Sequence, residues 1–348
     1  MNGLEFGIFP HGLELHDTVP GRLNERYWAP KDLSIIELKK YKSNVIKLPF
    51  SWERVIHDLD VKSLYPPYMY IIDKAIKTIT DTNQYCILQM FSFGRYNSHP
   101  KTSIFSDPIG GDIITIQNFV DTWVLLANRY KDNPLVMFNI MNEGPTESIQ
   151  MQELYVSGLV DAITAIRNIT QQHIFVSGVN GTFSSNWVDV NGELMMPIVR
   201  KKFRNVAFDI HQHFEIDLEN RAGGCTTNDM DALFGKTTDW LKANGQVALL
   251  GETMVLPRCI PVLDSALNYL DATGAWLGFT YYAAGPHWPE YIVANPSIYV
   301  ETIYKITGPQ LDMLIKYEGT GIPLVISAAT TNRGPALTLF ALSLLFLL

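Results

Sequence analysis

The chain has 348 residues, of which 47% are hydrophobic and 18% are charged, a composition typical of a globular protein and unlike that of a disordered or fibrous one. The formal net charge is -8, and no basic run with interleaved aromatic residues occurs, so nucleic acid is not an expected partner. The three cysteines, Cys86, Cys225 and Cys259, include no CxxC pair, which excludes a zinc ribbon and a CxxC redox motif.

Eight short apolar runs of strand length follow one another along the chain. Helical patterns such as residues 69–80 and 116–130 lie between most of them. Strands that alternate with helices form a parallel sheet, and eight such units predict an α/β fold of the (β/α)8 TIM barrel type. The alternative is a doubly wound open sheet, but no GxGxxG motif follows a strand and no P-loop occurs. The predicted strands are residues 4–9, 44–48, 86–90, 136–140, 174–177, 206–210, 247–250 and 278–282.

Polar and aromatic side chains follow the predicted strands. In a (β/α)8 barrel the active site lies at the carboxyl ends of the strands, and core packing does not call for these residue types there. The sequence therefore predicts one ring of site residues at the barrel mouth. Its members are Lys47, Ser92, Arg95, Tyr96, Asn142, Glu143, Asn180, His211, His213, Glu252, Tyr282 and Trp288.

Two glutamates in this ring form the predicted catalytic pair. Glu143 ends the buried run in "MFNIMNEGP", and Glu252 ends the run in "VALLGETMV". The two acids terminate the fourth and seventh strands, which face each other across the barrel mouth. Carboxyl groups about 5 to 5.5 Å apart across a sugar hydrolyse a glycosidic bond with retention of configuration, and like charges at that range separate the two pKa values.

Other members of the ring are predicted to bind the substrate. Asn142 would donate to a sugar 2-hydroxyl, and the flat rings of Tyr282 and Trp288 suit stacking on a sugar face. Lys47 and Tyr96 complete the predicted substrate-binding set. We expect His211 and His213 to hydrogen bond to the substrate or to Glu252; the alternative is that these two histidines and Glu252 hold a metal ion.

Several stretches together resemble the glycoside hydrolase family 5 cellulases, which are endo-β-1,4-glucanases. They include "LPFSWERV", "FGRYN", "FNIMNEGP", "DIHQHFEID", "CTTND", "LLGET" and "GFTYYAAGPHW", in the family's order between residues 4 and 288. The resemblance implies Glu143 as acid/base, Glu252 as nucleophile and a disulfide between Cys225 and Cys259, with Cys86 as a buried thiol. It also implies a β-glucan substrate, no cofactor, and a place outside the cell or at its surface. We expect a monomer.

The chain departs from the family pattern at several site positions. Since the loss of one preorganised donor typically costs on the order of 10² to 10³ in rate, we expect a hydrolase that is slow or altered in specificity. The alternative is a non-catalytic glycan-binding protein on the same barrel. The departures are Lys47 in place of Arg, Phe91 and Ser92 in place of His-Asn, His213 in place of Tyr, Tyr282 in place of Trp, and Gly144 in place of Pro.

Residues 1–318 are predicted to form the barrel and residues 319–348 a tail. The tail runs from small residues at 327–329 through a short polar spacer with Arg333 into an apolar end that is shorter than the roughly 20 residues a bilayer span needs. This order resembles a GPI-attachment signal, which would attach the protein to a membrane; the alternatives are a tail-anchor remnant or a terminal packed helix. Because such a signal requires secretion and residues 1–17 lack the basic and apolar regions of a secretory leader, we expect an incomplete N-terminus.

Overall fold

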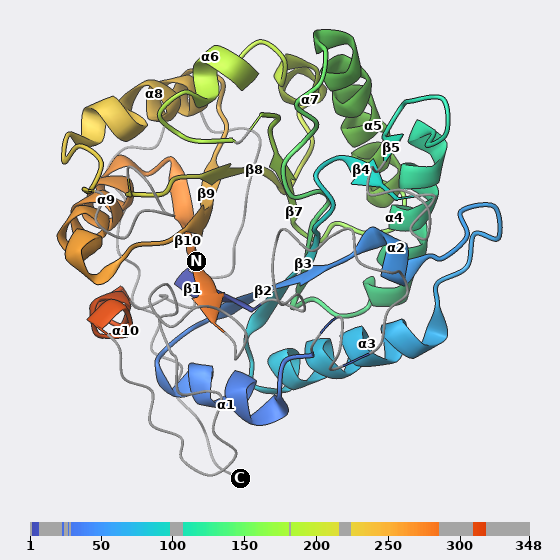
Figure 1. Ribbon diagram of the computed structural model, residues 1–348, viewed down its shortest axis with the longest axis horizontal. Coiled ribbons are helices and arrows are strands. Elements are labelled where there is room, and N and C mark those ends of the chain that lie inside the picture. The colour runs from blue at the N-terminus through green and yellow to red at the C-terminus, as the bar shows by residue number, and fades with distance from the viewer. Residues whose placement is uncertain are drawn as a thin grey trace, which may run out of the picture.

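The computed structural model describes residues 2–6, 23, 27, 29–97, 107–180, 182–215, 224–284 and 309–317, with the backbone alone for 2–6 and 283–284. Eight parallel strands close a barrel and follow the chain order around it (Figure 1). The predicted (β/α)8 fold and its eight strands are thereby confirmed. The strands are β1 (Asn2–Phe6), β2 (Val45–Phe50), β3 (Tyr85–Met90), β6 (Val136–Asn139), β7 (Ile174–Ser177), β8 (Val206–His211), β9 (Ala248–Thr253) and β10 (Trp276–Ala284).

Amphipathic helices surround the barrel (Figure 1). In α4, for example, Thr115 caps the first turn in a capping box with Asn118, and the face with Phe119, Trp123 and Leu126 is buried, so the cap fixes where the helix begins and the apolar face docks it. The helices that coincide with predicted patterns are α1 (Asp32–Lys40), α3 (Pro66–Asp81), α4 (Ile116–Tyr130), α5 (Ile149–Arg167), α8 (Lys236–Ala243) and α9 (Ile260–Thr273).

The loops contain short helices and strands that are not predicted from the sequence. None is long enough to show a hydrophobic period, because a helical pattern needs about 11 residues to be recognised. They are α2 (Trp52–Val55), α6 (Trp187–Asn191), α7 (Met196–Lys201), α10 (Pro309–Leu314), a π-helical turn (Asp231–Gly235), a 3-10 turn (Pro257–Cys259) and the two-stranded pair β4 (Arg95–Tyr96) and β5 (Asp107–Pro108).

Two layers of side chains with different chemistry fill the barrel interior. The first layer is apolar, and its members come from six neighbouring strands: Val45, Ile87, Met137, Phe175, Ala207 and Leu249. Because side chains alternate across a strand, the residue two positions on points to the same side. Those residues form a second layer, here called the polar layer, which is buried throughout and lies on the side of the barrel mouth: Lys47, Gln89, Asn139, Ser177, Asp209 and Gly251.

An ion pair holds the polar layer together. Lys47 Nζ donates to Asp209 Oδ2 at 3.1 Å and to the Gly251 carbonyl at 2.7 Å. The same Asp209 oxygen accepts from Asn139 Nδ2 and, at 3.2 Å, from Ser177 Oγ. A buried charge is tolerated only when it is paired and hydrogen-bonded, and these contacts meet that requirement for both Lys47 and Asp209.

The predicted tail lies outside the described residues, and so does the proposed boundary at residue 318. Both remain predictions. Within the described ranges, no helix combines the length and the apolar composition that crossing a membrane requires.

A substitution at Gly251 tests whether the buried ion pair of the polar layer stabilises the fold. A Cβ at this position would overlap with Asp209 Oδ1, so we expect Gly251→Ala to displace the buried ion pair and to lower the free energy of unfolding by about 3 to 5 kcal/mol. Urea denaturation measures the change.

Gly158→Ala is the matched control. Its added Cβ would meet Ile109 and Ile116 at an ordinary 3.6 Å, inside α5, where alanine is favoured over glycine by about 1 kcal/mol. We expect this variant to be as stable as the parent or slightly more stable. Equal unfolding midpoints for the two variants would contradict the packing of Asp209 on Gly251.

Candidate active site

The turn that carries Glu143 is fixed by the strands on either side of it. The Asn142 amide donates to the Met90 carbonyl at the end of β3, and the Gly144 amide donates to the Gly178 carbonyl after β7, each at 2.7 Å. Between them Glu143 adopts a positive φ of 48°, a conformation uncommon for a residue with a side chain and often found at functional sites. This turn carries the side chain whose Oε1 lies 2.9 Å from His211 Nδ1 at the end of β8.

Gly144 stands where the resembling family has proline, and its surroundings explain the residue. A Cβ at Gly144 would lie 2.5 Å from the Tyr155 ring and 2.7 Å from Val179 Cγ1. No side chain fits in that space without moving the buried Tyr155. The departure at this position is therefore a consequence of local packing.

His211 brings the two glutamates together. Its Nδ1 lies 2.9 Å from Glu143 Oε1 and 4.0 Å from Glu252 Oε2, so these two carboxyl oxygens lie no more than about 6.9 Å apart, the sum of the two distances. Acids 109 positions apart in the sequence thus meet at the mouth of the barrel. The limit includes the spacing of about 5 to 5.5 Å at which two carboxyl groups act on one glycosidic bond with retention.

A second histidine, His213, contacts Glu252. His213, two residues beyond His211, places Nε2 at 3.1 Å from Glu252 Oε1, and the Phe183 ring packs edge-on against its imidazole. The side chains of Glu143 and Glu252 are 21% and 14% exposed, so both are partly accessible from the mouth, whereas His211 behind them is fully buried.

The charges around the site keep Glu252 ionised and His211 protonated. Burial alone would raise the pKa of Glu252, but the charge of His211, the hydrogen bond with His213 and the charge of Lys47 outweigh it and lower that pKa to about 2. Burial would likewise lower the pKa of His211, but the charge of Glu252 and the contacts with Asp209 and Glu143 raise it to about 10. Near neutral pH the site therefore holds a carboxylate at Glu252 beside an imidazolium at His211.

Two residues predicted to bind substrate lie inside the protein, and those predictions are wrong. Lys47 is fully buried and belongs to the polar layer, because its ammonium group pairs with Asp209 below the mouth. Tyr96 is 4% exposed, donates its hydroxyl to the Ile56 carbonyl and packs edge-on against Trp52. Neither side chain is available to a ligand in the mouth.

The other predicted site residues have different surroundings. Asn142 is buried beside Glu143, and its Oδ1 accepts from Gln89 of the polar layer at 2.8 Å. Tyr282 is half-buried near the end of β10. Trp288 lies outside the described residues, so its predicted stacking on the sugar stays a prediction.

The polar layer beneath the two glutamates is not among the features predicted from the sequence. Asp209, Asn139 and Ser177 each interrupt an apolar strand near its carboxyl end, in "VAFDIH", "VMFN" and "IFVS". A polar residue at an inward position of a buried strand needs a buried partner. That signal is visible in the sequence, although the identity of the partner is not.

The loop beyond Glu252 is tied to the loop beyond β8 by a disulfide. Cys225 and Cys259 are bonded, with their Cα atoms 5.5 Å apart, and Glu215 accepts a hydrogen bond from the Leu256 amide in the same region. Cys86 is a buried free thiol whose pKa is raised by burial. The pairing that the family resemblance implied is therefore present.

The metal alternative has no support from the geometry. Across the described ranges, no three His, Cys, Asp or Glu side chains are arranged to hold a metal ion. The ring nitrogens of His211 and His213 that face the mouth are taken up by Glu143 and Glu252.

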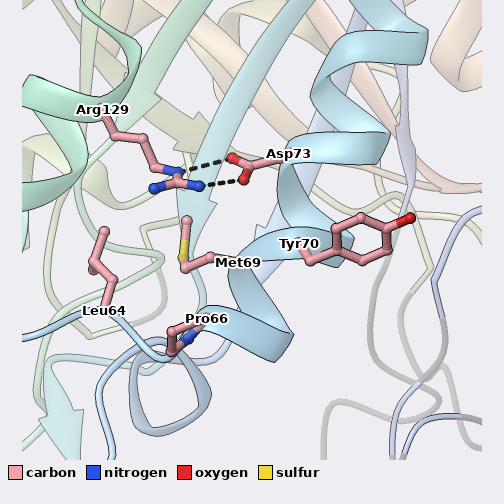
Figure 2. A pocket seen from close by; sticks show the side chains of 6 residues that line it. All are labelled: Leu64, Pro66, Met69, Tyr70, Asp73 and Arg129. Carbon is pink, nitrogen blue, oxygen red and sulfur yellow. Dashed lines mark hydrogen bonds and ion pairs between the residues drawn. The ribbon is translucent and has the colours of Figure 1, made fainter.

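A pocket of about 290 Å³ lies elsewhere, on the outside of the barrel between α3 and α4. Figure 2 shows the ion pair between Asp73 and Arg129 at its edge and the Tyr70 ring turned outward. Its lining includes none of the predicted site residues. The lining residues are Leu64, Pro66, Met69, Tyr70, Asp73 and Arg129.

Comparison with known proteins points to one family. A family model described as cellulase (glycosyl hydrolase family 5) matches residues 11–277. A probable endo-β-1,4-glucanase B of Aspergillus kawachii is 29% identical over 294 residues, which cover 82% of this chain and 83% of the relative. A solved endo-β-1,4-glucanase of Xanthomonas axonopodis pv. citri, a triple mutant, has a TM-score of 0.77 at 26% identity and covers 91% of this chain and 98% of its own. The structure of XacCel5A in complex with cellopentaose has a TM-score of 0.77 at 26% identity, over 90% and 97% of the two chains.

The raised pKa of His211 predicts how stability depends on pH. Because that pKa rises from 6.5 to about 10 on folding, the stabilisation is complete below pH 6.5 and is lost as pH rises through 10. We expect His211→Asn to be less stable than the parent at pH 6 by on the order of a few kcal/mol, and the difference to shrink as pH approaches 10. Urea unfolding at several pH values measures it.

His57→Asn is the control for that series, because His57 is exposed and its pKa is lowered. Its effect on stability should not change between about pH 8 and 10, where the imidazole is neutral in both the folded and the unfolded chain. A His211→Asn deficit that stays constant over this range would show that His211 is not charged in the folded protein.

Proposed function

The chain belongs to the cellulase family, glycosyl hydrolase family 5, and we propose that it is a retaining glycosidase that cleaves β-1,4-glucan or a related β-glucan. The observation that carries this proposal is the meeting of Glu143 and Glu252 at His211, where their carboxyl oxygens lie within the 6.9 Å limit set by the two distances from Nδ1. Two acids in this relation supply both the proton and the nucleophile that retaining hydrolysis needs.

The proposed reaction has two steps. Glu252 attacks the anomeric carbon while Glu143 gives its proton to the leaving glycosidic oxygen, so that the C–O bond breaks and a covalent glycosyl ester forms on Glu252. Glu143, now a carboxylate, takes a proton from water, and the water oxygen attacks the same carbon and releases Glu252. Neither step requires an electron carrier or a Lewis acid.

The electrostatics support these roles. His211, His213 and Lys47 lower the pKa of Glu252 to about 2, which suits a nucleophile that must be ionised. Glu143 contacts only one of them, His211, at 2.9 Å, and lies beside the negative charge of Glu252. Two carboxyl groups with different surroundings divide into an acid and a nucleophile.

The substrate class is supported by the relatives. The Aspergillus kawachii relative is named as a probable endo-β-1,4-glucanase, and a structural neighbour at 26% identity was solved with cellopentaose. We propose that Tyr282 and Trp288 stack on sugar rings of such a chain. Because a glucan polymer does not enter cells, the proposed reaction takes place outside the cell.

Glutamine variants test the catalytic pair. We expect Glu143→Gln and Glu252→Gln each to lower kcat/KM on carboxymethyl-cellulose by at least about 10³-fold, because glutamine neither gives a proton nor attacks carbon. Glu153→Gln is the matched control, since Glu153 is exposed on α5, and its activity should equal that of the parent. Release of reducing sugar from carboxymethyl-cellulose, lichenan and mannan is the measurement.

A substrate with an activated leaving group separates the two roles. Dinitrophenolate departs from an aryl β-cellobioside without a proton, so Glu143→Gln should still release it rapidly in the first turnover, whereas Glu252→Gln should not. The opposite pattern would exchange the two assignments. Binding of β-glucan without turnover by the parent would reject hydrolysis in favour of a glycan-binding protein.

A further inference from the structure

We propose that Asp209 is a positioning residue that keeps the His211 imidazole doubly protonated, so that Nδ1–H faces Glu143 in both steps of the reaction. This inference rests on the proposed function of Glu143. Asp209 is two residues before His211 in β8 and lies below the mouth, where a substrate does not reach. It would therefore act only through the histidine.

The position of Asp209 is fixed from three other strands. Its Oδ2 accepts hydrogen bonds from Lys47 of β2, Asn139 of β6 and Ser177 of β7. The side chain is fully buried, so water does not compete for this oxygen. The missing Cβ of Gly251 provides the space that the carboxylate occupies.

His211 lies between Asp209 and Glu143. Its Nδ1 is 2.9 Å from Glu143 Oε1, and its Nε2 is 3.7 Å from Asp209 Oδ2. Among the described residues Nε2 has no hydrogen-bond partner, and Asp209 is the anion that faces it. A buried ring with a carboxylate at each nitrogen is best matched by an N–H at each nitrogen.

Neither neutral form of the imidazole fits this arrangement. With the proton on Nδ1, the Nε2 lone pair would face the Asp209 carboxylate. With the proton on Nε2, the Nδ1 lone pair would accept the proton that Glu143 must give to the leaving oxygen. The imidazolium avoids both problems, because it donates toward Asp209 and toward Glu143.

The charges that face His211 come from several elements. The anions are Asp209 in β8, Glu143 after β6 and Glu252 in β9, the cation nearby is Lys47 in β2, and His213 after β8 is a further titratable group. Lys47 pairs with Asp209, so the Glu143 and Glu252 carboxylates remain to balance the imidazolium. One of these two groups is neutral at each stage of the reaction, as protonated Glu143 or as the ester on Glu252, whereas the Asp209 carboxylate faces Nε2 throughout.

The Nδ1–H group of His211 determines which oxygen of Glu143 carries the proton. While Glu143 holds its proton, Nδ1–H occupies Oε1 and leaves the proton on Oε2 for the leaving oxygen. After the transfer, the same N–H stabilises the new carboxylate. Asp209 thus acts on the orientation and the charge of the acid from a distance, and a change at Asp209 should alter the pH dependence of the reaction.

Asp209→Asn tests the proposal. The donors around Oδ2 would hold the amide oxygen in its place, so the variant keeps an acceptor near Nε2 and loses the charge. We expect kcat on carboxymethyl-cellulose to fall about 10- to 100-fold at pH 8, and markedly less at pH 5, where His211 stays protonated. Asp189→Asn is the control, because Asp189 is exposed and its variant should keep the parent pH profile.

A second readout does not depend on activity. The ring ¹⁵N signals of selectively labelled histidine, assigned with His211→Asn, should show two protonated nitrogens for His211 in the parent at pH 8 and one in Asp209→Asn. Two protonated nitrogens in both proteins would overturn the proposal. If the parent does not hydrolyse β-glucan, the proposed function fails, while this spectrum still decides the protonation of His211.

In Asp209→Asn the buried Lys47 loses its charged partner, which destabilises the fold. The double variant Lys47→Met with Asp209→Asn removes this unpaired charge. We expect the double variant to fold. Its kcat should still fall below that of the parent by a larger factor at pH 8 than at pH 5. Recovery of the parent profile would mean that Asp209 serves only to neutralise Lys47, and would overturn the proposal. A deficit of equal size at pH 5 and pH 8 would overturn it as well.

Discussion

The need to pair charge inside the barrel is the constraint on which the rest of the structure depends. Lys47 and Asp209 are both fully buried, and an unpaired charge there would cost several kcal/mol. Their pairing fixes the Gly251 carbonyl, one residue before Glu252, through Lys47, and it places a carboxylate opposite His211. The polar layer thus lies below the barrel mouth and helps to position both glutamates.

Much of this architecture can be predicted from the sequence, because it follows from local pattern. Alternation of apolar runs and helical periods gives the barrel, and Glu143 and Glu252 stand out because each ends a buried run. The places of Lys47 and Tyr96 could not be predicted in the same way. A strand-end position says that a side chain is near the mouth, but which way it points depends on inward or outward register and on neighbours such as Asp209 and Ile56, which lie 162 and 40 residues away.

Several residues that depart from the family pattern still have partners in the site. Lys47 contacts Asp209 and the Gly251 carbonyl, and His213 occupies the family's tyrosine position and still reaches Glu252. Gly144 avoids a clash with Tyr155. The surroundings of Glu252 therefore still lower its pKa, as an ionised nucleophile requires.

The central claim is that Glu252 attacks a sugar that Glu143 protonates across the barrel mouth. Trapping the intermediate tests it most directly: the protein is incubated with a 2-fluoro-β-cellobioside carrying an activated leaving group, and the labelled peptide is identified by mass spectrometry. The account predicts one covalent sugar on Glu252 and a first product with retained β configuration. A sugar attached at another residue, or a first product with inverted configuration, would contradict it.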